Sequence, residues 1–379
     1  MTKAWLKENK HYLFYGFIVV LTLSRVLGSR ILACLPDFDC NAYIQMANTI
    51  TYDSTILPHH AMRLLPALMA HGLMLLGLST ELAFRILSDS TYVLFGCLTF
   101  WVLKQFRVNS LLALATTLLC LAPHHAMRIP LQNVYQLCDM MTYPISLMLV
   151  YFSLKEKGKW VFALSIVALL TKQTVFGLGG LSLLYCFYKT RRIENLIYAV
   201  ILGLSYLGLS QYYHAFSIVG HHLIPNSDFF TLSNIGWIIQ DSKIIELFIP
   251  IIPFMIIYFK EIAQFLVRYW HIAGYMAVVM GQPFIAYHLT GNNFARLALQ
   301  GAWIVYLIIG LSLGARWQQD KKFQALFLIY SLAVFFTWSV HSRLIYMLSF
   351  IALWLIYYKT SSSKACALTI FSKSSPNAS

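Results

Sequence analysis

Long apolar runs separated by short polar segments make up most of this chain. Because a helix needs about 20 apolar residues to cross a bilayer, the pattern predicts an all-α transmembrane bundle with about twelve spans, in a range of eleven to thirteen. The predicted spans are residues 12–34, 84–103, 110–123, 139–154, 160–173, 175–188, 196–214, 244–259, 270–289, 296–314, 323–340 and 343–358. Residues 1–358 would then form a single transmembrane domain. The Ser- and Lys-rich residues 359–379 are expected to be a disordered cytoplasmic tail.

Lys and Arg residues lie between the apolar runs and predict which loops face the cytoplasm. Lys3, Lys7 and Lys10 precede a first run that is too long for a signal peptide, so we expect an uncleaved span with a cytoplasmic N-terminus. Threading from there puts every basic cluster inside, as the positive-inside rule expects. These clusters are Lys104 with Arg107, Lys155 with Lys157 and Lys159, Lys189 with Arg191 and Arg192, Lys260 with Arg268, Arg316 with Lys321 and Lys322, and the tail from Lys359. Both termini are therefore predicted to be cytoplasmic.

Two segments decide this topology. Residues 64–78 are an apolar stretch of only 15 residues, which we interpret as an external interfacial or re-entrant helix. Residues 160–188 are interpreted as two short helices that meet near Lys172. Reversing both choices gives a competing topology, which misplaces only the clusters around Lys104 and Lys157.

Composition and charge narrow the classes of protein. The chain is 59% hydrophobic and only 11% charged, which excludes an ordinary soluble domain. A net charge of +14 would suit nucleic acid, but the basic residues mark span ends and form no stripe with aromatic residues. Membrane lipids are therefore the expected surroundings, and no nucleic-acid partner is expected. Cys34 and Cys40 flank the first external loop and are either a disulfide or small packing residues.

A second group of charged residues is predicted at the external face. Ionisable side chains near hydrocarbon cost several kcal/mol unless they are paired or hydrated. The group therefore predicts a functional cavity, and the alternative is a set of salt bridges and snorkelling side chains. Its members are Arg63, Arg85, Arg128, Lys172, Arg296, Arg343, Asp37, Asp39 and Asp139.

The acidic residues and the histidines suggest specific chemistry. Asp37 and Asp39 follow the first span directly, where they could hold a divalent cation such as Mg or Mn, or act as a base and its orienting partner. The hexamer PHHAMR occurs at residues 58–63 and again at 123–128. Either its two Arg residues reach one ligand, or a Pro-initiated interfacial turn arose twice. Its His59, His60, His124 and His125 are candidate zinc ligands, interfacial hydrogen-bonding residues or substrate contacts.

Taken in order, these motifs resemble the GT-C membrane glycosyltransferases, which include protein O-mannosyltransferases and aminoarabinose transferases of lipid A. The resemblance covers residues 12–190, about half of the chain. The chain lacks the K-P-P-L motif of the aminoarabinose enzymes and the large soluble C-terminal domain of several members. The matching segments are Asp39 with Tyr43, the turn from His59 to Pro66 with Arg63, GLSTELAFRILS at 77–88, Asp139 in QLCDMMTYP, and LLTKQT at 169–174.

The resemblance implies transfer of a sugar from a polyprenyl-phosphate donor to a lipid, glycan or protein acceptor, with inversion, at the external face. Asp39 would be the general base, and Asp37 and Asp139 would orient it or bind a metal. Fixed cations would hold the lipid phosphate. The expected substrate contacts are Tyr43, Arg63, Arg128, Lys172, Asn292, Asn293, Arg296, Arg343, His59, His60, His124 and His125.

Two other classes of protein stay open. A transporter or flippase of lipid-linked sugars also needs a charged cavity, although the chain shows no inverted repeat and its charges gather at one face. An acyltransferase or a polymerase of surface polysaccharide would use a His base instead. The compact layout, with no organelle signal, suggests a bacterial inner membrane with the site facing the exterior.

Overall fold

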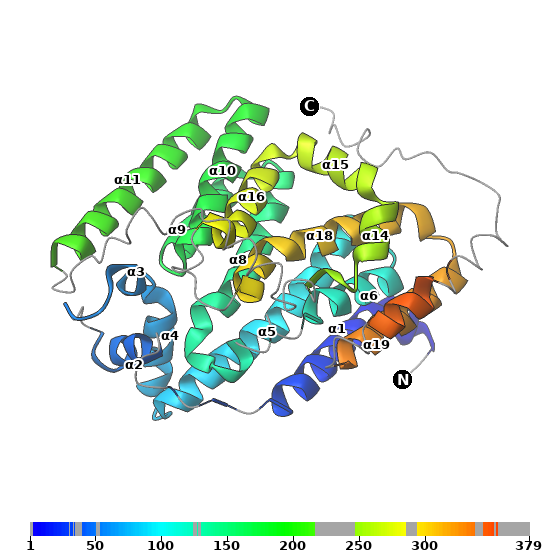
Figure 1. Ribbon diagram of the computed structural model, residues 1–379, viewed down its shortest axis with the longest axis horizontal. Helices are drawn as coiled ribbons and strands as arrows, with labels where there is room; N and C mark the ends of the chain where they lie inside the picture. Colours follow the sequence, from blue (N-terminus) through cyan, green and yellow to red (C-terminus); the bar gives the residue numbers. More distant parts are fainter. Residues whose placement is uncertain are drawn as a thin grey trace.

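The protein is helical in the part of the chain that the computed structural model describes, and these residues contain no strand (Figure 1). The prediction of an all-α fold is therefore confirmed there. The described residues are 3–29, 31–32, 34, 40–50, 54–123, 127, 130–216, 247–285, 294–337, 344–351 and 354. The helices are α1 (Lys3–Leu27), α2 (Cys40–Thr49), α3 (Pro58–Ala61), α4 (Leu64–Met74), α5 (Thr80–Gln105), α6 (Ser110–Leu121), η1 (Val134–Gln136), α8 (Leu137–Leu154), α9 (Gly158–Leu169), α10 (Gln173–Thr190), α11 (Ile193–Phe216), α14 (Ile252–Ile257), α15 (Phe259–Arg268), α16 (Trp270–Ile285), α18 (Phe294–Trp317) and α19 (Lys321–Phe336).

Four helical segments of the described chain are long and apolar enough to cross a membrane. They are Thr80–Gln105, Val134–Leu154, Ile193–Ala215 and Ala298–Trp317. Other apolar helices are shorter: α6 and α9 have 12 residues each. At a rise of 1.5 Å per residue such a helix is about 18 Å long, whereas the hydrocarbon core is about 30 Å thick. The membrane character of these helices is clear, and the count of twelve spans stays a prediction.

The structure bears on the two segments that decide the topology and corrects one predicted span. The break near Lys172 is confirmed, since α9 ends at Leu169 and α10 begins at Gln173. Residues 64–78 yield only the 11-residue α4. The predicted span at 244–259 is not one helix: residues 249–251 form a turn and α14 has six residues. Pro250 and Pro253 explain the interruption, because proline cannot donate the backbone hydrogen bond that a helix interior needs.

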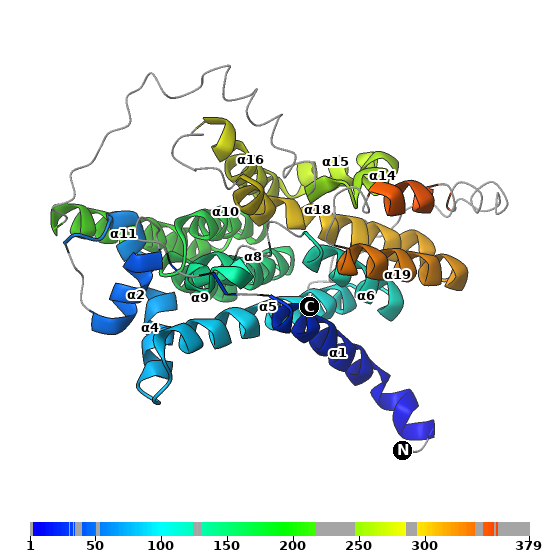
Figure 2. The same ribbon diagram turned by 60° about the horizontal axis from the view of Figure 1, so that its bottom comes forward.

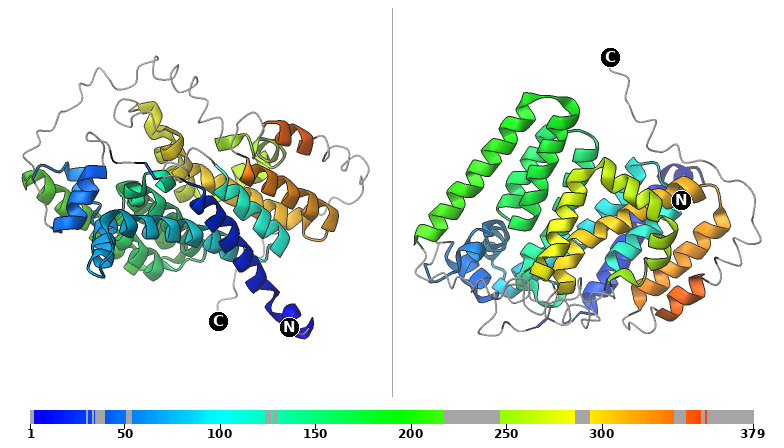
Figure 3. Two further views of the ribbon diagram at one scale, coloured as in Figure 1. Left: turned by 90° about the horizontal axis from the view of Figure 1, so that it is seen from below. Right: turned by 45° about the horizontal axis from the view of Figure 1, so that its top comes forward.

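The basic clusters gather at one end of the bundle. Lys155 Nζ lies 4.9 Å from the centre of the Phe106 ring, although the two residues come from different predicted loops. Arg316 Nη2 donates to Glu261 Oε1 at 2.6 Å. In the right panel of Figure 3, the turn between α10 and α11 lies at the upper end with α15, while α2 and α4 lie at the lower end. We call the upper end, which carries Lys155, Lys189 and Arg316, the basic end.

Small residues allow the helices to approach closely. A Cβ atom added at Gly179 of α10 would lie 2.2 Å from Ser165 Oγ of α9, so these two helices form a tight hairpin. A Cβ atom at Gly310 of α18 would lie 2.4 Å from Thr116 Cγ2 of α6. Close contact at small residues is a common way to hold transmembrane helices together, because lipid removes the hydrophobic driving force between them.

The segment between α1 and α5 is folded against the bundle as a group of short helices. Figure 2 shows α2 and α4 beside the beginning of α5. A disulfide joins Cys34 to Cys40 at the start of α2, with the two Cα atoms 5.9 Å apart, so the disulfide alternative is the one observed. His71 Nδ1 of α4 donates to the Ala47 carbonyl of α2 at 2.8 Å. These links fix the segment that carries Tyr43, His60 and Arg63.

Candidate functional site

At the end of the bundle opposite the basic end, polar side chains from four segments lie together in one group. Both α8 and α10 have 18 residues, so each is about 27 Å long. Each begins in this group and ends toward the basic end. We call the group the polar cluster, and its members are Tyr43, His60, Arg63, Cys138, Asp139, Lys172 and Gln173.

The centre of the polar cluster is the hydroxyl of Tyr43, which is 1% exposed. Arg63 Nη1 donates to this oxygen at 2.7 Å. The hydroxyl proton is then directed to Nδ1 of His60, 3.2 Å away, and the same nitrogen lies 3.4 Å from Arg63 Nη1. Tyr43 of α2 and His60 of α3 thus hold one side of the Arg63 guanidinium in place.

The tip of the α9–α10 hairpin closes the other side of Arg63. Arg63 Nε donates to Gln173 Oε1 at 3.3 Å, and Gln173 Nε2 donates to the His59 carbonyl at 3.1 Å. A backbone bond of 2.9 Å from Leu65 to the Leu170 carbonyl strengthens this contact. Both segments were predicted as external, and the structure brings them together from positions more than a hundred residues apart.

Beneath this contact lies a buried ion pair between Lys172 and Asp139. Lys172 Nζ donates to Asp139 Oδ1, and the two side chains are 4% and 3% exposed. Asp139 is in the first turn of α8, where the positive end of the helix dipole favours a carboxylate. The neighbouring Cys138 Sγ lies 3.4 Å from the Tyr43 hydroxyl, so the pair is continuous with the rest of the polar cluster.

The polar cluster carries a surplus of positive charge. Arg63 and Lys172 are cations, whereas Asp139 is its only carboxylate. Burial raises the pKa of the Tyr43 phenol well above its ordinary value, and the nearby Arg63 opposes this shift only partly, so the phenol stays neutral. Burial would lower the pKa of Arg63, but Tyr43, Cys138 and Asp139 outweigh it and the pKa is raised. Arg63 is therefore a fixed, half-buried cation with capacity for an anion.

Several predicted site residues lie outside the part of the chain that the structure describes, so their predictions stay untested. For Arg296 only the backbone is described, within α18. Of the predicted residues that are described, His59 is exposed, while the other five belong to the polar cluster. The predicted residues outside the described part are Asp37, Asp39, His124, His125, Arg128, Asn292, Asn293 and Arg343.

Arg85 and Arg25 have structural partners. Arg85 pairs with Asp89 at 2.5 Å and donates to the Val26 carbonyl at 2.6 Å, so the salt-bridge alternative applies to it. Arg25, which the sequence patterns did not single out, donates from Nη1 to the Leu121 carbonyl at 2.5 Å. It thereby caps the C-terminal end of α6, where a cation is favoured. An Arg inside the apolar run of the first predicted span was the available signal.

The two copies of PHHAMR share one backbone hydrogen bond. In the first copy the Met62 amide donates to the Pro58 carbonyl at 3.0 Å, and in the second the Met127 amide donates to the Pro123 carbonyl at 3.0 Å. Both methionines are at least 96% buried. The first copy is thus a Pro-initiated helical turn, and in both copies the Met is packed inward. This observation favours a packing reason for the repeat, while the shared-ligand interpretation depends on Arg128.

Sequence reasoning missed polar residues that extend the polar cluster inward. Thr174 Oγ1 donates to Gln300 Oε1 at 2.9 Å, which ties the start of α10 to α18. Gln300 is 1% exposed, and its Nε2 has no hydrogen-bond partner in the described structure. Gln300 lies inside the predicted span 296–314. Its polar side chain in that apolar run was the only feature of the sequence that could have marked it.

The described residues contain no group of three His, Cys, Asp or Glu side chains placed to hold a metal ion. The predicted cation at Asp37 and Asp39 falls outside them. What the described part of the polar cluster offers is anion recognition: a fixed guanidinium, an ammonium beside a carboxylate, and hydrogen-bonding groups of Tyr43 and Gln173 around them. The chain matches no family model, no curated protein and no solved structure.

Proposed function

We propose that the chain is an integral membrane glycosyltransferase that moves a sugar from a polyprenyl-phosphate donor to an acceptor at the end of the bundle that carries the polar cluster. The observation that supports this best is that the Arg63–Tyr43 hydrogen bond and the buried Asp139–Lys172 ion pair belong to one polar cluster, in which Cys138, the neighbour of Asp139, contacts the Tyr43 hydroxyl. These residues belong to segments whose order in the chain resembles the GT-C enzymes. The twelve-span bundle, the cytoplasmic termini and a bacterial inner membrane form part of the same proposal.

In this proposal the polar cluster receives the phosphate of the leaving group. Arg63 already makes hydrogen bonds with the side chains of Tyr43, His60 and Gln173, which hold the guanidinium plane in place. Its Nη2 donates to no acceptor among the described residues, so it has capacity for a phosphate oxygen. Lys172 has three protons on its ammonium and adds positive charge close by. A preoriented cation stabilises the developing phosphate charge without the cost of reorganisation.

Proton removal from the acceptor is assigned to Asp39, which directly precedes α2 in the chain and stands four residues before Tyr43. Asp139 is already neutralised by Lys172, so it is a poor proton acceptor. Its role in the proposal is to position Lys172. Asp37, Arg128, Arg296, Arg343, Asn292 and Asn293 are proposed to complete the donor and acceptor contacts.

The test uses purified protein in liposomes with a panel of polyprenyl phosphates that carry hexosyl, N-acetylhexosaminyl or pentosyl groups, and with an added lipid, glycan or peptide acceptor whose hydroxyl receives the sugar. Release of polyprenyl phosphate is measured for the wild type, Asp39→Asn and Arg63→Gln. We expect Asp39→Asn to abolish release and Arg63→Gln to lower kcat/KM by roughly 10- to 100-fold, because a hydrogen bond to a charged group is worth about 1.5–3 kcal/mol. Arg192→Gln, an exposed Arg at the basic end, is the matched control.

The same liposomes separate transfer from transport. Donor that crosses the bilayer intact, with no release of polyprenyl phosphate by the wild type, would replace the proposal by the flippase. Release that Asp39→Asn leaves unchanged would remove the base assignment. Release that Arg63→Gln leaves unchanged would remove the polar cluster as the phosphate site.

A further inference from the structure

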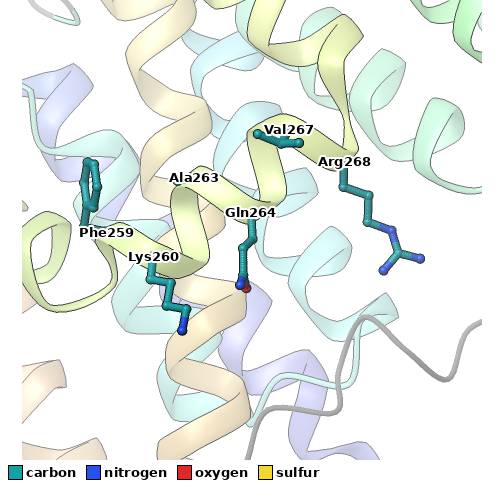
Figure 4. Close-up of a pocket in the computed structure, with 6 residues that line it drawn as sticks. All are labelled: Phe259, Lys260, Ala263, Gln264, Val267 and Arg268. Carbon is teal, nitrogen blue, oxygen red and sulfur yellow. The ribbon is translucent and has the colours of Figure 1, made fainter.

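The helix α15 at the basic end presents two exposed stripes of different chemistry. Figure 4 shows Phe259 and Val267 on one side of the helix, and Lys260, Gln264 and Arg268 projecting to another. Lys260, Gln264 and Arg268 are four residues apart, and Phe259 and Val267 are eight apart with Ala263 between them, so each stripe runs along one face. Together with Ala263 these residues form the outer side of α15.

A third face of α15 holds the helix on the protein. Ile262 and Phe265 are buried in the core. Glu261, the only acidic residue of α15, is 6% exposed and accepts the hydrogen bond from Arg316 of α18. The one negative charge is therefore turned inward, and the outer side of α15 carries only positive charge and neutral groups.

The large exposed surface of the apolar stripe would be unfavourable in water. Phe259 is 71% exposed and Val267 is 80% exposed, and Ile256, just before α15, is 73% exposed. Leaving large apolar side chains in water costs about 25 cal/mol for each Å² of their surface. A helix with this stripe beside a basic stripe has the composition of one that lies in the interface of a bilayer.

The position of α15 agrees with that composition. It connects α14 to α16 at the basic end, where Tyr269 packs against Tyr185 near the end of α10. We propose that α15 lies in the membrane interface at the basic end and binds anionic phospholipid headgroups. Phe259 and Val267 enter the acyl region, Lys260 and Arg268 contact headgroup phosphates, and Gln264 donates a hydrogen bond between them. Lys260 and Arg268 are eight residues apart, or about 12 Å along the helix, which is room for neighbouring headgroups.

The test measures lipid preference with the full chain in liposomes. Spin-labelled phosphatidylglycerol and spin-labelled phosphatidylcholine are compared by the fraction of each that the protein immobilises. For Lys260→Gln with Arg268→Gln we expect the preference for phosphatidylglycerol to fall roughly twofold or more, because each basic residue near an anionic surface contributes appreciably to binding. Lys260→Arg with Arg268→Lys keeps both charges and is expected to retain the preference.

The matched control is Lys159→Gln with Lys322→Gln, which removes two exposed charges from the same end but from other helices. If this control lowers the preference as much as the α15 variant does, the basic end attracts lipid diffusely and the α15 site is overturned. An unchanged preference in the α15 variant overturns the site too, and a protein partner for the same stripes would then be sought. This proposal does not depend on the glycosyltransferase assignment, and its readout needs no sugar donor.

Discussion

At the residue scale, the buried pair of Asp139 and Lys172 is the feature on which the polar cluster depends. Both side chains are almost fully removed from solvent. Desolvating two charges is costly, so such a pair contributes little net stability, but loss of one partner leaves an unpaired buried charge. The pair therefore acts mainly as a positioning device. It holds Lys172 at the start of α10, beside the Gln173 that contacts Arg63.

We predict that Asp139→Asn or Lys172→Met alone destabilises the protein by about 3–5 kcal/mol, the cost of a buried unpaired charge. The double variant should recover most of that loss, because neither charge remains, yet it should not recover sugar release. Thermal unfolding in detergent measures the first effect. Asp89→Asn is the control and should cost less, since Arg85 keeps its bonds to the Val26 carbonyl and to Ser29. A double variant as unstable as the single ones would show that the two residues do not act as a pair.

At the scale of the element, the α9–α10 hairpin carries Lys172 and Gln173 on its tip, and the close approach at Gly179 sets its geometry. The sequence predicted the break in this hairpin, because a Lys in the middle of an apolar run is costly in lipid. It did not predict the contact of the tip with α3 and α4, since hydrogen bonds between distant segments leave no local pattern. α15 was missed for another reason. Residues 260–269 were assigned to a cytoplasmic loop because of Lys260 and Arg268, although their basic residues have the spacing of one face of a helix.

We predict that Gly179→Ala costs about 1–3 kcal/mol through overpacking, because the new methyl group would lie 2.2 Å from Ser165 Oγ. It should also weaken donor binding, since the hairpin tip moves relative to Arg63. Ser165→Gly removes the opposing atoms and should rescue both effects. Gly177→Ala in the same helix is the control: nothing lies within 4 Å of its added Cβ, so it should be neutral or stabilising. Equal losses at both glycines, measured by thermal unfolding, would contradict the close-packing argument.

At the scale of the whole molecule, the fold separates the chain into a basic end and an end with the polar cluster. The sequence anticipated this division through the positions of Lys and Arg, and five of its predicted external site residues meet in one cluster: Tyr43, His60, Arg63, Asp139 and Lys172. Sequence alone could not give their mutual hydrogen bonds or the buried pairing of Asp139, which arise from the packing of α2, α8 and α10. The sequence also misplaced helix ends: the predicted span 244–259 is broken by a turn at 249–251, whereas α5, α11 and α18 are longer than the predicted spans 84–103, 196–214 and 296–314.

The division into two ends predicts how the loops label. In the structure the segments around Phe106 and Lys155 contact each other, so both must lie on the same side of the membrane. We expect Gln105→Cys, Lys157→Cys and Arg192→Cys to react with a membrane-impermeant thiol reagent only after cells are opened, and Thr55→Cys to react in intact cells, with the wild type as the background for the native cysteines. All four positions are exposed. In the competing topology, positions 105 and 157 would react in intact cells while 192 would not. That result would put Lys104 and Lys157 on the external side, contrary to the positive-inside rule, and would separate them from the Arg191 and Arg192 cluster at the same end of the bundle.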